Sequence, residues 1–156
     1  MQHENFFLPR IVVRQKEEIL LNSFLLMTLV EFSSQIKDKA GNTIHINLKE
    51  HHKGRVININ THISGYIIKN VLAAASQFNV KNGLIEISFK EYTDYYRFAI
   101  SAQSSLLLWK KKLDNPIEEY SLNSLIARKH LEQIGGKFKV NYMNGIYLKF
   151  SAIIPK

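Results

Sequence analysis

The chain contains no cysteine, which excludes a disulfide framework and any thiolate-based catalysis or metal binding. The apolar stretch from Ile19 to Val30 is too short for a membrane-spanning helix, which needs about 20 residues. The first ten residues lack the basic segment and apolar run of a signal peptide. We therefore expect a cytoplasmic chain without a membrane span, with residues 1–10 as a lead and residues 11–156 as one domain.

Acidic side chains are also scarce. The 156 residues include 13 Asp and Glu against 21 Lys and Arg, so the formal charge is +8. This excess suits an acidic protein partner, nucleic acid or an acidic membrane surface. Many ordinary soluble proteins are equally basic, so the charge alone does not select among these partners.

The usual catalytic motifs are absent, since the sequence holds no P-loop, no HExxH and no GxSxG. His51 and His52 are adjacent in a polar turn, where a solvated turn fits better than a metal pair. His62 and His130 have no nearby cluster of ligands, so we interpret both as structural. The residues alone thus predict no catalytic group and no metal site.

A helix followed by two paired strands organises the chain between Ile63 and Phe98. Apolar residues recur at helical spacing up to Phe78, and Thr61 is the expected N-cap. After a turn at Asn82-Gly83, apolar and polar residues alternate over 85–89 and again over 95–100. Two such runs joined by a short polar link predict an antiparallel hairpin.

The preceding residues predict a first strand at 11–14, then a helix from about Leu20 to Lys37 with Glu17 and Glu18 just before it. Leu21, Leu25, Leu29, Phe32 and Ile36 form its stripe, widened by Phe24, Met27 and Val30. Because this helix is strongly apolar, we expect it to be buried on more than one side, or else to bind a partner or a second copy of the chain. Strands are expected at 44–48 and 56–59.

Beyond the hairpin, the periodicity is lost from Ser101 to Tyr120. This stretch is interpreted as a loop that either packs Leu107 and Trp109 onto the core or exposes them for contact. A last helix from Leu122 to Ile134, with Leu125 and Ile126 on its apolar side, ends at Gly135-Gly136. Strands are expected at 138–142 and 146–152, joined by a tight turn.

Several of these segments resemble the ATP-binding domain of sensor histidine kinases, whose fold is shared with gyrase, the heat-shock chaperone and the mismatch-repair ATPases. Residues 70–78, NVLAAASQF, are similar to the family's NLLxNAxKF, and residues 121–137 are similar to its GLGLSIVKKIVELHGGK. The resemblance extends from Ile11 to Lys156. It implies an α/β two-layer sandwich in which three helices cover one face of a mixed, mainly antiparallel sheet.

The same resemblance places the family's nucleotide-binding positions, and most of them carry other residues here. Asn70 is kept, but Ala74 stands for the magnesium-binding asparagine and Gln77 for the phosphate-side lysine. Ala102 stands for the aspartate that recognises adenine. Ser121 and Asn123 replace the glycines of GLG, and no DxGxG or GxG occurs anywhere in the chain.

These replacements remove the groups that nucleotide binding needs. Alanine offers neither a carboxylate for adenine nor an oxygen for a cation, and side chains at positions 121 and 123 obstruct the approach of phosphates to backbone amides. Each lost hydrogen bond to a buried ligand group costs about 1–3 kcal/mol. Since about 1.4 kcal/mol is tenfold in affinity, three losses weaken binding by several orders of magnitude. We therefore expect no cofactor.

The resulting hypothesis is a catalytically inactive relative of the kinase domain, acting as a protein-interaction or regulatory module in two-component-type signalling. The resemblance implies a kinase, a phosphotransfer domain or a receiver domain as partner, and a homodimer is a further option. One alternative is an atypical ATP-binding histidine kinase domain that uses Mg-ATP. Another is a basic nucleic-acid-binding domain.

An interaction surface is expected on the sheet face that the helices leave open. Side chains alternate along a strand, so the residues between the apolar ones point to that face. It is either a plain solvated face or a docking surface for an acidic partner. The contact candidates are Tyr95, Arg97, Lys137, Lys139, Tyr147 and Lys149, together with Trp109 in the loop.

Overall fold

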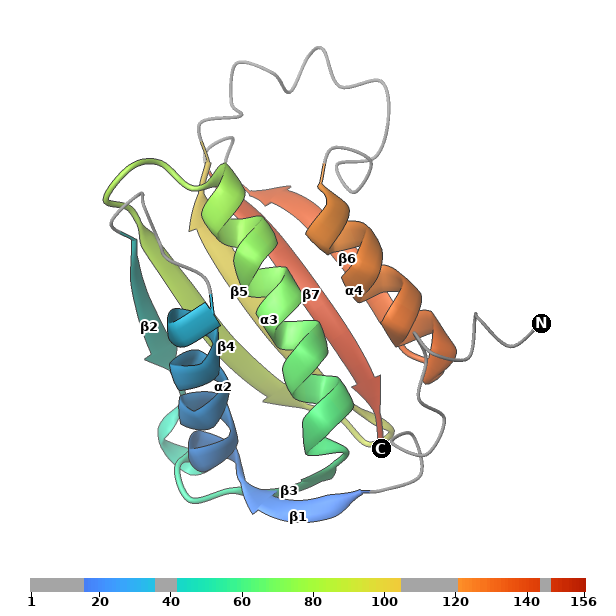
Figure 1. Cartoon of the computed structure of the whole chain (residues 1–156). Coiled ribbons are helices and arrows are strands. Elements are labelled where there is room, and N and C mark those ends of the chain that lie inside the picture. Colours follow the sequence, from blue (N-terminus) through green and yellow to red (C-terminus); the bar gives the residue numbers. More distant parts are fainter. Residues whose placement is uncertain (1–15, 36–41, 105–120, 144–146) are drawn as a thin grey trace, which may run out of the picture.

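The computed structural model describes residues 16–35, 42–104, 121–143 and 147–156, and its described part forms two layers (Figure 1). A five-stranded sheet has the order β2-β4-β5-β7-β6. Strand β2 pairs with β4 in parallel, and the other neighbours are antiparallel. The strands are β2 (Thr43–Asn47), β4 (Leu84–Glu91), β5 (Tyr95–Gln103), β6 (Lys137–Met143) and β7 (Tyr147–Pro155).

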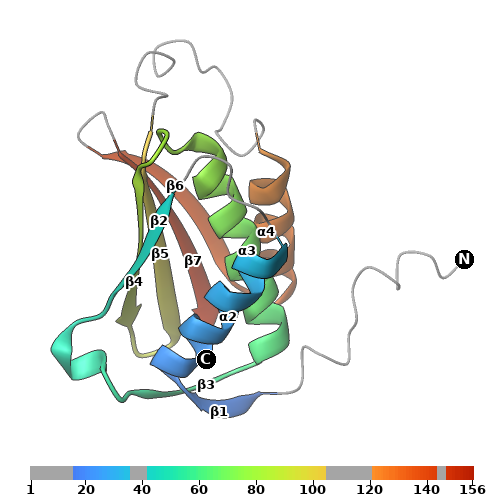
Figure 2. The same ribbon diagram turned by 60° about the vertical axis from the view of Figure 1, so that its left-hand side comes forward.

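Three helices lie on the same face of this sheet, as the two views agree (Figures 1 and 2). They are α2 (Leu21–Gln35), α3 (Thr61–Phe78) and α4 (Leu122–Gln133). A separate antiparallel pair, β1 (Glu17–Leu20) with β3 (Val56–Ile59), lies at the end where α3 begins, and a 3-10 helix spans Glu50–His52. The expected sandwich of three helices on a mixed, mainly antiparallel sheet is confirmed.

The core lies between the sheet and α3. Alternate residues of the strands, among them Ile87, Phe98 and Phe150, are fully buried beneath this helix. The Phe98 ring meets that of Phe24 from α2 at a centroid distance of 5.9 Å. Two alanines of α3, Ala74 and Ala75, are likewise fully buried. The expected inward face of the hairpin is therefore confirmed.

The start of the described chain differs from the sequence prediction. Glu17 and Glu18 do not precede the first helix as free acidic residues but lie in β1, where they pair with Ile59 and Asn58. The helix begins at Leu21, whose backbone N–H donates to the Arg55 carbonyl at 2.8 Å. The backbone pairing with β3 places this segment in a strand. The strand expected at 11–14 and the end of the helix beyond Gln35 lie outside the described residues.

The N-cap of α3 is also one residue earlier than predicted. Asn60, not Thr61, accepts a hydrogen bond from the Ile63 N–H, at 3.0 Å from Oδ1. A capping side chain reaches the N–H three residues ahead, which fixes the first turn of the helix. The Thr61 hydroxyl instead donates to the carboxylate of Glu17.

Two helices expose apolar residues that were expected to be buried. On α2, Met27 and Val30 are 50% and 69% exposed, so this helix is buried on one side only. On α4, Leu122 is exposed and Ile126 is only half-buried, so Ile126 is not the core residue we expected. The buried face of α4 is instead made of Ser124, Ala127 and Leu131. Small residues there allow α4 to lie close against α3.

Strand β5 continues through Ser101, where the periodicity was expected to fail. It pairs with β7 as far as the partners Gln103 and Tyr147. Small and polar side chains hide the alternation there, but the backbone pairing is regular. The remainder of the expected loop, including Leu107 and Trp109, lies outside the described residues. None of the described helices combines the length and apolarity that a membrane span requires.

Candidate functional site

Four of the six nucleotide-position residues form direct contacts between α3 and the first turn of α4. Asn123 Nδ2 donates a hydrogen bond to Asn70 Oδ1 at 3.0 Å. The Ser121 hydroxyl lies 3.4 Å from Oε1 of Gln77, which is about two turns further along α3 than Asn70. The amide of Asn70 is completed by its own helix, since Nδ2 donates to the Tyr66 carbonyl at 3.0 Å. These polar side chains therefore form hydrogen bonds with one another and with the helix backbone.

The residues at the remaining two positions are apolar and buried. Ala74 on α3 and Ala102 on β5 have no exposed surface. Ala102 pairs in the sheet with Ile85 on one side and Leu148 on the other. A methyl group at each of these positions packs within the core and offers no hydrogen bond to a ligand.

The first turn of α4 is capped from within the chain. Ser121 has an extended backbone and is almost fully buried, and its Oγ accepts a hydrogen bond from the Ser124 N–H at 3.2 Å. Free N–H groups at a helix N-terminus are what makes such a site attractive to phosphate. Here a serine side chain takes one of those donors.

The fold that carries these residues is similar to several solved structures. The catalytic domain of the histidine kinase ThkA, in a nucleotide-free form, superposes with a TM-score of 0.68 at 20% identity, covering 91% of this chain and 96% of that one. The chain has the fold of a histidine kinase catalytic domain. A histidine kinase from Burkholderia phymatum gives a TM-score of 0.70 at 11% identity, over 94% of this chain and 73% of its own.

A third structure agrees, since the histidine kinase AdeS of Acinetobacter baumannii gives a TM-score of 0.69 at 11% identity, over 90% of this chain and 67% of its own. No protein-family model matches the sequence, and no curated protein is similar to it. At these identities the likeness establishes the kinase fold and leaves the chemistry to the residues themselves.

The second candidate site of the kinase fold is the open face of the sheet, which no described element covers (Figure 2). Pairing places Lys90 directly beside Arg97, and Ile153 separates Arg97 from Lys137 in the same row. In another row, Lys149 lies between Ser101 and Asn141. The row between them carries the small residues Ser88, Ala99 and Ser151, of which Ala99 and Ser151 are buried.

An aromatic pair supports the cations at one end of this face. The rings of Tyr92 and Tyr95 stack with a centroid distance of 4.4 Å. Lys90 Nζ and the Arg97 guanidinium carbon lie 5.2 and 5.7 Å from the Tyr92 centroid. Arg97 Nε is buried and has no hydrogen-bond partner among the described residues. Lys90, with Glu86, was expected on this face from the strand alternation, whereas Tyr92 in the hairpin link was not among the contact candidates.

One carboxylate balances part of this charge. Glu86 Oε2 lies 3.7 Å from Nδ1 of His45 on β2, across the edge of the sheet. Of the expected contact residues, Lys137, Lys139 and Tyr147 are exposed, while Tyr95, Arg97 and Lys149 are half-buried. The structure therefore brings all of them except Trp109, which lies outside the described residues, to one face.

Of the histidine pair, His51 is exposed as expected for a solvated turn, but His52 is not. His52 is buried, with its ring 5.0 Å from that of Phe89, and burial together with the nearby charge of His51 lowers its pKa. No group of three or more metal-binding side chains occurs within the described ranges. His52 is thus a packed side chain.

A three-membered ion cluster closes the opposite end of the sheet from Ala102. Arg55 donates two hydrogen bonds of 2.7 Å to the carboxylate of Glu91, and Lys156 Nζ adds another of 2.7 Å. The Arg55 hydrogen bonds, more than the attraction of Lys156, hold the pKa of Glu91 at about 2, below its usual 4.5. The cluster sets two cations against one carboxylate, so it keeps a net charge of +1.

Proposed function

We propose that this chain is a kinase-fold domain that works without nucleotide, as an interaction module in two-component-type signalling. The observation that carries the proposal is the pairing of Asn123 with Asn70 and of Ser121 with Gln77. A nucleotide would have to break these contacts and would meet methyl groups at Ala74 and Ala102 in return. Breaking these part-buried hydrogen bonds without replacing them is unfavourable.

The deciding measurement is calorimetry with Mg-ATP on the full chain, beside a histidine kinase catalytic domain that binds nucleotide. We expect no saturable heat at millimolar Mg-ATP. Ala102→Asp alone is expected to leave binding absent, because the phosphate side stays occupied by Ser121 and Asn123. Micromolar binding by the unmodified chain would contradict the proposal and favour the atypical kinase.

The partner in this proposal is an acidic protein surface that docks on the open face of the sheet. Five cations and one carboxylate lie there, and Glu86 is already beside His45. Complementary charge raises association rates and favours one orientation of the partner. The half-buried Arg97 over Tyr92 supplies the kind of aromatic and arginine centre that contact surfaces favour. Kinase, phosphotransfer and receiver domains are the classes to test first.

Charge reversal tests the docking face. The variant with glutamate at Lys137, Lys139 and Lys149 is expected to lose partner binding while its melting temperature stays nearly unchanged. A matched control reverses Lys53, Lys81 and Lys129, which are exposed and lie outside the sheet. This control makes the same change in net charge and should bind normally.

Equal loss in both variants would show that net charge alone matters. Undiminished binding by the first variant would move the contact away from this face. Salt-dependent binding of an oligonucleotide, removed by the same three substitutions, would support the nucleic-acid alternative instead.

A further inference from the structure

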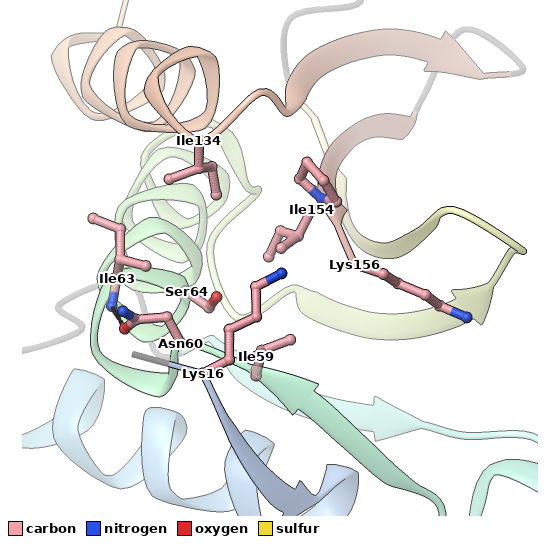
Figure 3. Close-up of a pocket in the computed structure, with 9 residues that line it drawn as sticks. Lys16, Ile59, Asn60, Ile63, Ser64, Ile134, Ile154 and Lys156 are labelled. Carbon is pink, nitrogen blue, oxygen red and sulfur yellow. Dashed lines mark hydrogen bonds between the residues drawn. The ribbon is translucent and has the colours of Figure 1, made fainter. Parts of the chain in front are cut away.

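A pocket at the N-terminal end of α3 has no counterpart in the proposed function. It has a volume of about 190 Å³ and lies where the ends of several elements meet (Figure 3). Lys16 directly precedes β1, and Ile134 directly follows α4. The lining residues are Lys16, Ile59, Asn60, Ile63, Ser64, Ile134, Ile154, Pro155 and Lys156.

Two lining side chains each bury one polar atom that has no hydrogen-bond partner in the described part of the chain. Ser64 is 1% exposed, and its Oγ has no hydrogen-bond partner in the described part of the chain. Asn60 is 6% exposed, and its Nδ2 is likewise unpartnered, although its Oδ1 caps α3. An unpaired buried polar group is costly, and Figure 3 shows the Ser64 hydroxyl on the side of α3 that faces the pocket, which indicates a site that a ligand completes.

The available groups define the polar part of this ligand. Asn60 Nδ2 and the Lys16 ammonium can only donate, and the Ser64 hydroxyl can donate as well. Figure 3 shows the Lys16 side chain extending toward the middle of the pocket, whereas Lys156 points away toward Glu91. No carboxylate is among the described residues that line the pocket. Glu17 lies nearby but is bound by Thr61.

The rest of the lining defines the remainder of the ligand. Ile59, Ile63, Ile134, Ile154 and Pro155 form an apolar wall, and the positive end of the α3 dipole lies beside it. A cavity of about 150 Å³ holds benzene, so this volume suits roughly six to eight non-hydrogen atoms. Acceptor oxygens carrying negative charge must therefore adjoin a compact apolar body.

We propose that this pocket binds a small monocarboxylate with a short, branched apolar chain. The carboxylate accepts a hydrogen bond from Ser64 and pairs with Lys16, and its hydrocarbon part contacts the isoleucines. The bound molecule joins the start of α3 to the end of β7 and to Ile134. This proposal stands apart from the proposed function, because it uses none of the same residues.

The test is an NMR titration of the ¹⁵N-labelled full chain with 3-methylbutanoate, which has the required size and charge. We expect saturable shifts of the amide signals of Ile63, Ser64 and Ile134. The uncharged analogue 3-methylbutanamide and the short anion acetate should each bind at least about tenfold more weakly, since each lacks one half of the recognition. Absence of saturable shifts at tens of millimolar would overturn the proposal.

Variants locate the site. Ser64→Ala and Lys16→Gln should each weaken binding about tenfold, because a hydrogen bond to a charged group is lost. The matched control Lys53→Gln removes an exposed lysine that pairs with Glu50 and should bind like the unmodified chain. Equal binding by all three variants would place the carboxylate elsewhere and overturn the proposal. Equal binding of the acid and its amide would overturn the anionic class.

Discussion

The polar side chains at the two ends of α3 differ in whether they have hydrogen-bond partners. Toward its C-terminal half, Asn70 and Gln77 contact Asn123 and Ser121 across to α4. At its N-terminus, the Ser64 hydroxyl and Asn60 Nδ2 are buried without a partner. Ser64 and Asn60 are 1% and 6% exposed, whereas Gln77 is exposed and Asn123 is half-buried, so the unpartnered groups lie at the more buried end. Side-chain pairs complete the first end, whereas the proposed carboxylate would complete the second.

The largest expected effect concerns the charge cluster next to the unpaired end. The pKa of Glu91 in the folded chain is about 2, below its ordinary value of 4.5. Its contribution to stability is therefore fully present above about pH 4.5 and is lost as the pH falls toward 2. We expect the free energy of unfolding to fall by about 2–3 kcal/mol over this range because of Glu91.

Denaturant titrations at several pH values check this prediction. Glu91→Gln should lower stability at neutral pH and flatten the acid limb. Glu50→Gln is the control, because the Glu50 side chain is 89% exposed and contacts only Lys53 within the described residues. An unchanged acid limb in Glu91→Gln would mean that the cluster does not stabilise this end.

The next effect tests the paired end. Asn123→Ala should lower the free energy of unfolding by about 1–2 kcal/mol, because Asn70 Oδ1 is left without its side-chain partner. The double variant that also carries Asn70→Ala should cost less than the sum of the two single variants. Chemical unfolding of the four proteins measures this coupling. Strict additivity would show that the pair contributes nothing as a pair.

Much of the fold could be predicted from the sequence because its signals are local. The alternation over 85–100 and the turn at Asn82-Gly83 fix the hairpin. The helical spacing up to Phe78 fixes α3, whose cap was misplaced by only one residue. Where the signal depends on distant partners, prediction failed. Glu17 forms a strand because β3 is available, and nothing near it in the sequence indicates that pairing.

The helix faces were predictable only in part. On α4 the largest apolar residues suggested the buried side, yet Leu122 is exposed while Ala127 and Ser124 are buried. Close packing against α3 selects small residues, and that requirement is visible only in three dimensions. An apolar count therefore overestimates the core role of Ile126, which is half-buried.

The candidate sites, too, were predictable only where they do not depend on residues distant in the sequence. The resemblance identified Asn70, Gln77, Ser121 and Asn123 as positions but not as mutual partners, because the pairing joins residues 44 and 53 positions apart. The N-terminal pocket was missed entirely. Its sequence signal was weak but present: Ser64 adjoins Ile63, on the side of α3 that meets the core.

A smaller effect separates the two roles of Ser121. Its hydroxyl caps α4 and contacts Gln77. Ser121→Ala should cost about 1 kcal/mol, whereas Ser121→Gly should cost a few tenths, since glycine leaves the helix end open to water. Thermal unfolding of both variants measures the difference. We expect Ser121→Gly not to bind Mg-ATP, because Ala74 and Ala102 still lack the polar groups; binding there would show that the serine alone blocks the site.

The smallest effect on stability is expected at the unpaired end. Ser64→Ala removes a hydroxyl that makes no hydrogen bond, so the free energy of unfolding should change by less than about 0.5 kcal/mol. Ser124→Ala is a matched control, because its hydroxyl is also buried and unpartnered within the described residues but lies away from the pocket. The two variants should melt alike without ligand.

Added 3-methylbutanoate should then distinguish these two serines. A ligand that binds only the folded state raises the melting temperature in proportion to its occupancy. We expect a rise for the unmodified chain and for Ser124→Ala, and a much smaller rise for Ser64→Ala. If both variants respond alike, the unpaired hydroxyl of Ser64 is a tolerated defect of packing, and the difference between the ends of α3 has no bearing on ligand binding. If Ser64→Ala alone fails to respond, the same hydroxyl that stabilises nothing in the free chain is the group that holds the carboxylate.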